Sequence, residues 1–316
     1  MPESARPLTI SILIATYNRE DLLQPLFDSI DEAAAEAPEL GVEIVIVDDG
    51  SSDGTWSRLE AEKEKRPNLV IHCQKNAGRA AALNQTFIHA SGDIGFILDS
   101  DDLLTKESLK LVAEAWKTIG NDSSFGGVIG HCLVLEGEKK GQIIGDQFPQ
   151  SITYSDPEEL RVHHKVKGDK KEVLRMQLLK DNLFPLTPGE RRVPTSLILN
   201  RIGATHKFLL IHGNLIHKTY LEGGMSLTID KTRAKSARGS RLVYKENLHR
   251  RRFKDPRITL RNATNLVRYN LHAGEPMTKD YILAAPFYSS LAGLIMGVLL
   301  YRKDLKNYPE LKQSKP

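Results

Sequence analysis

Four short apolar runs, each followed directly by polar residues, dominate the first third of the chain. They cover residues 8–15, 42–47, 69–73 and 94–98. Runs of this length, rich in β-branched side chains, are typical of strands that are covered on both faces. Apolar residues at helical spacing follow the first three runs, for example Leu22, Leu23 and Leu26. Repeated strand and helix units predict an α/β fold with a mostly parallel, Rossmann-like sheet flanked by helices.

Each predicted strand ends in side chains that suit a polar ligand. The four clusters are Thr16-Tyr17-Asn18-Arg19, Asp48-Asp49, Lys75-Asn76-Ala77-Gly78-Arg79 and Asp99-Ser100-Asp101-Asp102. The glycines and serines after Asp49 permit tight turns and a close approach of the backbone to a ligand. Because ligands of such sheets bind outside the carboxyl ends of the strands, we expect all four clusters to line one site.

The fourth cluster, an acidic turn at residues 99–102, has two interpretations. A buried strand cannot keep unpaired carboxylates in the core, because a buried and unpaired charge is costly. The turn could be solvated, with an aspartate capping the helix predicted from near Lys106. Alternatively it holds a hard divalent cation, Mn²⁺ or Mg²⁺, which prefers carboxylate oxygens. The agreement of all four clusters on one edge of the sheet favours the metal.

Composition excludes several classes of protein. Of the 316 residues 40% are hydrophobic and 27% are charged, as in globular proteins, and the net charge is +4. This charge suits anionic partners without indicating nucleic acid. Cys73 and Cys132 lie in apolar runs, so neither a disulfide framework nor a zinc site is indicated. The N-terminal residues lack the apolar segment of a signal peptide, which predicts a cytoplasmic location.

The pattern changes after residue 125. Two apolar stretches at 126–135 and 142–145, separated by a polar turn, predict a hairpin in a mixed half of the sheet. A charged region follows, with a predicted helix over 171–180. His163 and His164 in this region are interpreted as solvated side chains, because no carboxylate lies at ligand spacing.

A basic region begins after Asp230 and predicts a mainly helical extension. A solvated helical face is its default explanation, and a diphosphate clamp or attraction to anionic lipid are the functional alternatives. Residues 282–300 are apolar and uncharged. Pro286, Ser289 and Ser290 favour a core or interfacial helix over a membrane span. We therefore divide the chain into a domain of residues 1–230, with halves 1–105 and 106–230, and an extension of residues 231–316.

The four strand-end clusters together resemble family-two glycosyltransferases with the GT-A fold. The resembling segments are Thr-Tyr-Asn-Arg, Val-Asp-Asp-Gly-Ser-Ser-Asp-Gly-Thr, Asn-Ala-Gly-Arg, Ala-Ser-Gly-Asp and Asp-Ser-Asp-Asp, in this order. The resemblance implies a nucleotide-sugar dependent, inverting enzyme with a donor half (1–105) and an acceptor half (106–230). The processive synthases of the family carry Gln-x-x-Arg-Trp and several spans, which this chain lacks. Transfer of a single hexose, in cell-surface or capsular polysaccharide synthesis, is therefore implied.

The resemblance also assigns roles to residues. It places the metal on Asp101, with Asp99 beside it, in an Asp-x-Asp motif, and Asp102 near the sugar hydroxyls as a catalytic residue. It places uracil or ribose on Asp48 or Asp49, and the phosphates or sugar near Arg79. The donor-binding residues that it implies are Thr16, Tyr17, Asn18, Arg19, Asp48, Asp49, Gly78, Arg79, Asn84, Asp99 and Ser100. The expected partners are a UDP-sugar, a glycan or lipid-linked acceptor, and the inner face of a membrane contacted by the extension.

The general base is the point at which this chain departs from the pattern. An inverting transfer needs a base on the acceptor hydroxyl. The resembling family has an acidic residue after a proline where this chain has Thr195, so Glu190 is the candidate base, although it could equally form a salt bridge to a neighbouring arginine. His212 and His217 are further candidates for metal or phosphate contacts.

Two alternative functions stay open. One is a nucleotide-sugar binding protein with lost or weak turnover, suggested by Thr195. The other is a nucleotidyltransferase, which would also set carboxylates at strand ends but would need a glycine-rich phosphate loop after the first strand.

Overall fold

The structure is a computed structural model that describes residues 7–219, 229–250, 255–276 and 287–312. Its chain forms two compact units, Met1–Leu183 with Arg201–Tyr220, and Phe184–Asn200 with Leu221–Pro316. The predicted boundary at residue 230 lies close to the start of the second unit, but that unit also takes in residues 184–200. Residues 282–286 of the predicted apolar helix lie outside the described residues.

The first unit is built on one sheet of nine strands in the order β3-β2-β1-β4-β8-β6-β9-β5, with β7 paired to β9. Four parallel strands form its first half: β1 (Thr9–Thr16), β2 (Gly41–Asp48), β3 (Leu69–Cys73) and β4 (Ile94–Ile97). These are the four predicted strands, and their carboxyl ends meet at one edge. The α/β prediction with a mostly parallel half is confirmed.

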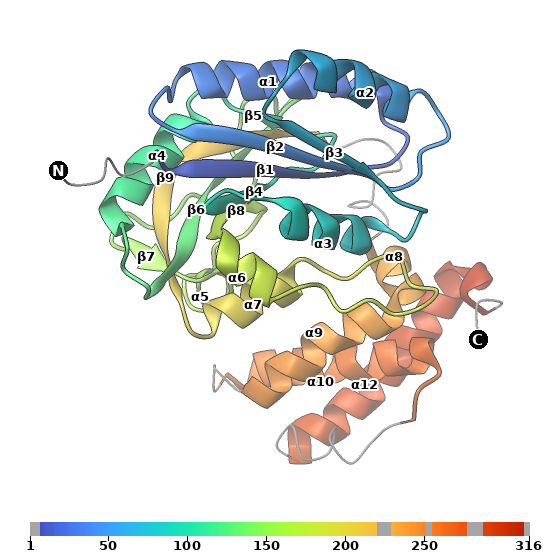
Figure 1. Ribbon diagram of the computed structural model, residues 1–316. Helices are drawn as coiled ribbons and strands as arrows, with labels where there is room; N and C mark the ends of the chain where they lie inside the picture. Colours follow the sequence, from blue (N-terminus) through green and yellow to red (C-terminus); the bar gives the residue numbers. More distant parts are fainter. Residues whose placement is uncertain (1–6, 220–228, 251–254, 277–286, 313–316) are drawn as a thin grey trace. The chain divides into compact units, whose positions relative to one another are not determined.

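Helices cover both faces of this sheet (Figure 1). They are η1 (Glu20–Leu22), α1 (Leu23–Ala35), α2 (Thr55–Lys65), α3 (Arg79–His89) and α4 (Ser108–Ile119). Leu26 and Phe27 of α1 and Trp116 of α4 share one buried core with Ile12 and Phe96 of the strands. Burial on this scale is the main force that holds the sheet and its helices together.

The second half of the sheet is mixed. It contains β5 (Leu103–Leu104), β6 (Phe125–Val134), β7 (Tyr154–Ser155), β8 (Lys170–Arg175) and β9 (Lys207–Lys218), together with the short helices α5 (Pro157–Val162) and α6 (Met176–Asp181). The predicted hairpin is present, because Ile144 N donates to Cys132 O and Val134 N donates to Gln142 O. Its second arm forms only an isolated bridge.

The helix predicted over 171–180 is wrong for its first half. Residues 170–175 form β8, which lies antiparallel between β4 and β6, and only residues 176–181 form a helix. Val173 pairs with Phe96 of β4 and with Val128 of β6, so β8 is hydrogen-bonded to a neighbouring strand on both sides. Such pairing with distant segments overrides a local helical preference.

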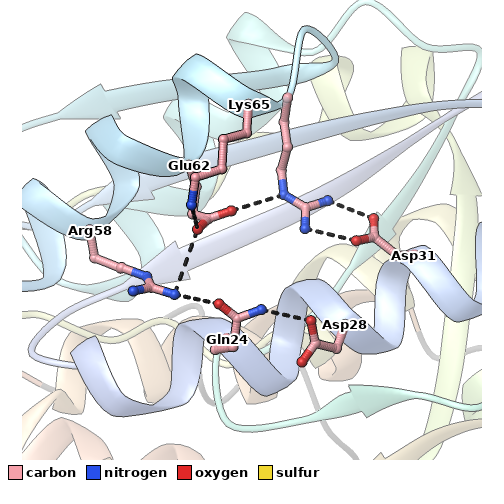
Figure 2. A network of polar contacts seen from close by, with 7 residues as sticks. Gln24, Asp28, Asp31, Arg58, Glu62 and Lys65 are labelled. Atoms are coloured by element: carbon pink, nitrogen blue, oxygen red, sulfur yellow. Dashed lines mark hydrogen bonds and ion pairs between the residues drawn. The ribbon is translucent and has the colours of Figure 1, made fainter.

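A polar network on the surface joins α1 to α2 (Figure 2). The Arg66 guanidinium binds both carboxylate oxygens of Asp31, at 2.6 and 2.7 Å, and its Nε lies 3.2 Å from Glu62 Oε2. Nearby, Glu20 accepts a hydrogen bond from Gly54 N, so the loops that precede both helices are also joined. These contacts hold the loops that follow β1 and β2 in a fixed relation.

The second unit is helical. It contains α8 (Ile229–Lys235), α9 (Ala237–Arg250), α10 (Pro256–Ala273), α12 (Phe287–Asn307) and η2 (Pro309–Lys312). The boundary between the two units falls within α7 (Ser196–Gly203), after Asn200. At Gly297 of α12 an added Cβ would lie 2.5 Å from Val267 Cβ, so glycine permits α12 and α10 to pack closely.

Several basic residues of the second unit are neutralised within it. Arg268 binds Asp304 through two hydrogen bonds of 2.6 Å, and the two side chains are almost completely buried. Arg238 and Arg241 pair with Glu275, and Lys231 pairs with Glu310. The charge of the extension is therefore smaller at the surface than its sequence indicates. Arg251, Arg252 and Lys254, which the sequence also counts there, lie outside the described residues.

Candidate active site

The ends of β1 and β2 are joined by hydrogen bonds between their loops. Asn18 adopts a positive φ of 51°, which asparagine tolerates better than most residues. Its N–H donates to Ser51 Oγ and its Oδ1 accepts from Ser52 N, both at 2.8 Å. The Ser51 hydroxyl in turn donates to the buried Asp48 carboxylate. Asp48 therefore stabilises the loop after β2 by accepting hydrogen bonds from it.

Asp49 fastens the loop that follows β3. Its carboxylate accepts hydrogen bonds from Gln74 Nε2 at 2.7 Å and from the backbone N–H groups of Ala77 and Gly78 at 2.8 Å. Gly78, at a φ of 94°, precedes the first residue of α3. The bonds from Asp49 thus set where α3 begins, and Arg79 is the first residue of that helix.

Arg79 reaches the acidic turn from the start of α3. Its Nε donates to Asp99 Oδ1 at 2.9 Å. Burial alone would raise the pKa of Asp99, but the charges of Arg79, Lys171 and Lys218 hold it well below its usual range. Asp99 is therefore a carboxylate at every physiological pH.

The negative charges of the other two carboxylates of the turn, Asp101 and Asp102, are less well balanced by nearby positive charge. Burial and the charge of Asp99 raise the pKa of Asp101. Burial raises the pKa of Asp102 to about 6, although Lys171 and Lys218 oppose the shift. Asp102 is 1% exposed, and its Oδ2 has no hydrogen-bond partner among the described residues. A buried carboxylate and a half-buried one, whose negative charges are not fully balanced, favour the binding of a cation.

A divalent cation fits this turn. Within the residues that the structure describes, no three histidine, cysteine, aspartate or glutamate side chains gather as a complete metal site. Mg²⁺ and Mn²⁺ do not need one, because they bind through one or two carboxylates and take further oxygens from a phosphate ligand. Asp101, beside Asp99, supplies such carboxylates.

Sequence reasoning missed three residues beside the turn. Lys218, the last residue of β9, has its pKa raised because the charges of Asp102, Asp169 and Asp99 outweigh burial. Its Nζ lies 3.3 Å from Asp169 Oδ2. Lys171, on β8, also faces Asp99 and Asp102. Recognising 170–175 as a strand would have placed Lys171 and Asp169 at this edge.

The remaining predicted donor-site residues occupy the same edge or the helix behind it. Thr16 ends β1, and its buried Oγ1 has no partner within the described part of the chain. Tyr17 is 43% exposed, and Arg19 lies close enough to Asp101 to lower its pKa. Ser100 lies buried within the turn, and Asn84 lies buried on α3.

Glu190 lies in the second unit, where it has a structural role. Its two carboxylate oxygens accept hydrogen bonds from Arg238 N at 2.7 Å and Gly239 N at 2.8 Å. These are N–H groups of the first turn of α9, which lack partners within the helix. Glu190 therefore caps α9.

The two candidate histidines lie within β9. His212 stands edge-on to Phe148, and His217 pairs with Leu103 of β5. Neither belongs to a group of metal-ligating side chains in the described ranges.

A family model described as glycosyl transferase family 2 matches residues 11–181, more than half of the chain. Among curated proteins, the chain is 36% identical over 119 residues to dolichol-phosphate mannosyltransferase of Pyrococcus furiosus, covering 38% of this chain and 33% of that protein. It is 30% identical over 146 residues to poly-beta-1,6-N-acetyl-D-glucosamine synthase of Staphylococcus aureus, covering 46% of this chain and 32% of that protein. The matches thus span about a third of each relative.

Solved structures share the GT-A fold of this chain. Residues 1–349 of S. aureus TarS, solved in complex with UDP, superpose with a TM-score of 0.59 at 19% identity, covering 97% of this chain and 91% of that chain. The mannosyltransferase PcManGT from Pyrobaculum calidifontis, in complex with GDP-Man and Mn²⁺, gives a TM-score of 0.51 at 21% identity, covering 95% and 88%. The match to TarS extends over the second unit as well as the first.

Proposed function

The chain belongs to glycosyltransferase family 2, and on this premise we propose that it is an inverting, metal-dependent, non-processive hexosyltransferase. It would move one sugar from a UDP-sugar to an acceptor hydroxyl on a glycan or a lipid-linked intermediate. The observation that carries the proposal is the acidic turn, in which Asp99 binds Arg79 while the negative charges of Asp101 and Asp102 are poorly balanced.

The names of similar proteins support the choice of donor and pathway. TarS has been solved with UDP and with UDP-GlcNAc. A matching relative is named poly-beta-1,6-N-acetyl-D-glucosamine synthase, after the polysaccharide that it makes. We propose by analogy a UDP-sugar donor and a role in cell-surface or capsular glycan synthesis, at the cytoplasmic face of a membrane.

Departure of the nucleotide is the step that these residues would assist. As the anomeric carbon–oxygen bond breaks, negative charge grows on the diphosphate, and positive groups held in place stabilise that charge. A Mn²⁺ or Mg²⁺ ion held by Asp101 and Asp99 would supply Lewis-acid stabilisation of the diphosphate when bound. Arg19, Arg79 and Lys218 add positive charge at the same edge. Asp102 would accept hydrogen bonds from sugar hydroxyls through its unpartnered oxygen.

Uracil and ribose would bind between the ends of β1 and β2. Because the carboxylates of Asp48 and Asp49 already accept internal hydrogen bonds, we propose that they act partly by shaping this pocket. The exposed ring of Tyr17 and the unpartnered hydroxyl of Thr16 are then available for the nucleoside.

Two carboxylates compete for the role of general base. Glu190 is the candidate from the sequence, but it uses both oxygens to cap α9. Asp169 is half exposed and is linked through Lys218 to the acidic turn. We propose to compare Glu190→Gln with Asp169→Asn in steady-state transfer assays. The base variant should lower kcat at least 100-fold while the affinity for UDP stays unchanged.

A binding protein with weak turnover is the second candidate function. It is favoured by Thr195 in place of the expected acidic residue and by the capping role of Glu190. Donor hydrolysis in the absence of acceptor separates the two functions, because a pure binding protein would release no UDP from any UDP-sugar.

Titration calorimetry of UDP, with and without Mn²⁺, tests the donor site directly. The wild type should bind UDP more tightly with Mn²⁺, and Asp101→Asn should lose this metal-dependent gain. Asp28→Asn is the matched control, because Asp28 lies exposed on α1 and contacts only its neighbour Gln24 among the described partners. The absence of UDP binding by the wild type in all conditions would contradict the proposal.

A further inference from the structure

Helix α12 carries an apolar face that the other described residues of its unit leave uncovered. Tyr288, Leu291, Ile295 and Leu299 follow one another at spacings of three and four residues, so they lie on one side of the helix. Their exposed fractions are 84%, 50%, 57% and 57%. A row of large exposed apolar side chains is unusual on a monomeric protein and marks a contact surface.

The opposite side of α12 is the one that packs within the unit. Gly297 lies against Val267, Ser290 is buried, and Asp304 binds Arg268 and His272 of α10. The exposed row is therefore not the side of α12 that packs into the core of the unit. It is a second face of a helix that is already anchored.

Basic residues continue this face toward the end of the helix. Arg302, Lys303 and Lys306 are all exposed, and they follow Leu299 at spacings of three, four and seven residues. The single acidic residue of α12, Asp304, is buried on the packed side. The exposed face thus combines apolar side chains with positive charge and carries no negative charge from α12.

We infer that this face of α12 docks on a lipid bilayer that contains anionic lipids. Helices with an apolar face bordered by lysine and arginine lie in the membrane interface, where the apolar side chains enter the headgroup boundary and the basic ones bind anionic lipid. No helix within the described residues is long and apolar enough to cross a membrane.

Charge selects the bilayer over a second copy of the chain. A second copy packed in parallel would bring three more positive charges toward Arg302, Lys303 and Lys306, and one packed antiparallel would offer them no anionic group from α12, whereas anionic lipid would neutralise them. The inference deepens the proposed membrane location but does not depend on the donor site, because all of its residues lie in the second unit.

Cosedimentation of the full chain with vesicles tests the inference. Vesicles of neutral phosphatidylcholine are compared with vesicles that contain about one third phosphatidylglycerol. The wild type should bind the anionic vesicles at least fivefold more than the neutral ones, and high salt should reduce the difference. The double variant Leu291→Ser with Ile295→Ser and the triple variant Arg302→Gln with Lys303→Gln and Lys306→Gln should each lose at least fivefold.

Matched controls separate this face from general effects. Ile88→Ser with Leu186→Ser removes equally exposed apolar side chains elsewhere, and Lys106→Gln with Lys110→Gln and Lys117→Gln removes the same charge from α4 and the turn before it. Both controls should bind vesicles as the wild type does. UDP binding by every variant reports on the donor site separately.

Three results would overturn the inference. The wild type could stay in the supernatant with both kinds of vesicle, or the α12 variants could bind vesicles as the wild type does. Light scattering could instead show a dimer that Leu291→Ser with Ile295→Ser dissociates, without vesicle binding, which would assign the face to a second copy of the chain.

Discussion

Arg79, the first residue of α3, donates a hydrogen bond from Nε to Asp99 Oδ1, the first carboxylate of the acidic turn. This contact joins the start of α3 to the turn after β4, through two residues that are 20 positions apart in the sequence. It keeps Asp99 charged, and it places a guanidinium at the edge where the other clusters of the predicted donor site meet. The pair therefore links the part of the site that we propose binds the nucleotide to the part that we propose binds the metal.

Replacement of Arg79 should weaken donor binding. Arg79→Gln removes a positive charge from the edge that would hold the diphosphate, so we expect the Kd for UDP with Mn²⁺ to rise about tenfold, equivalent to ~1.4 kcal/mol. Calorimetry measures the change. Arg58→Gln on α2, which contacts only Gln24 and Glu62 in the described structure, should leave the Kd unaltered. An unchanged Kd for UDP in Arg79→Gln would show that Arg79 does not contribute to donor binding.

Asp102 should give the enzyme a pH dependence near pH 6. The raised pKa of Asp102, about 6, means that the carboxylate gains its charge as the pH rises through this value. If the charged form binds the sugar, kcat/KM should fall about tenfold per pH unit below 6 and level off above it. Asp102→Asn should lower the activity and abolish this inflection. A wild-type profile that is flat between pH 5 and 7 would contradict the assignment.

The ionisation of Asp102 should increase activity as the pH rises but should decrease the stability of the folded chain. Between the ordinary aspartate pKa of 3.8 and about 6, the folded chain retains a proton on Asp102 that the unfolded chain has lost. Stability must therefore decrease as the pH rises through this window. At pH 7.5, Asp102→Asn should increase the free energy of unfolding, by up to about 3 kcal/mol, in urea titrations. A loss of stability instead would show that the charged carboxylate is well compensated.

Removal of the Glu190 carboxylate should destabilise the second unit. Glu190→Ala leaves the N–H groups of Arg238 and Gly239 at the start of α9 without their acceptors, a loss of about 1 to 2 kcal/mol. Glu190→Gln keeps one acceptor oxygen and should lose less. Urea unfolding followed by circular dichroism compares the two variants. Equal stability of wild type and Glu190→Ala would rule out the capping role.

Loss of Asp304 should be more damaging, because it leaves a buried arginine unpaired. Burial raises the pKa of Asp304, but hydrogen bonds from His272 and Arg268 lower it below its usual value. The stability that this pair contributes is therefore present above pH 4 and is lost as the pH falls further. Asp304→Asn should destabilise by about 3 to 5 kcal/mol at pH 7. Lys303→Gln, an exposed neighbour on α12, should change stability by less than about 0.5 kcal/mol.

The sequence by itself determined the first half of the sheet and its edge. Short β-branched runs covered on both faces allow no other element of that length, so β1 to β4 begin and end within about two residues of the predicted positions. Since parallel strands share a carboxyl edge, the positions of Asp49 and Asp101 in the sequence were enough to bring them to one edge.

Only the tertiary structure decided what surrounds those carboxylates. Lys171 and Asp169 reach the turn because β8 pairs with β4, and Lys218 reaches it because β9 pairs with β6, contacts between segments more than 70 residues apart. The exposed face of α12 could not be predicted from the sequence either, because the apolar pattern of residues 287–300 does not reveal which side packs against α10. Local patterns specify strands and helices, whereas the pairing of distant segments sets the charge beside a site and the face that a helix leaves free.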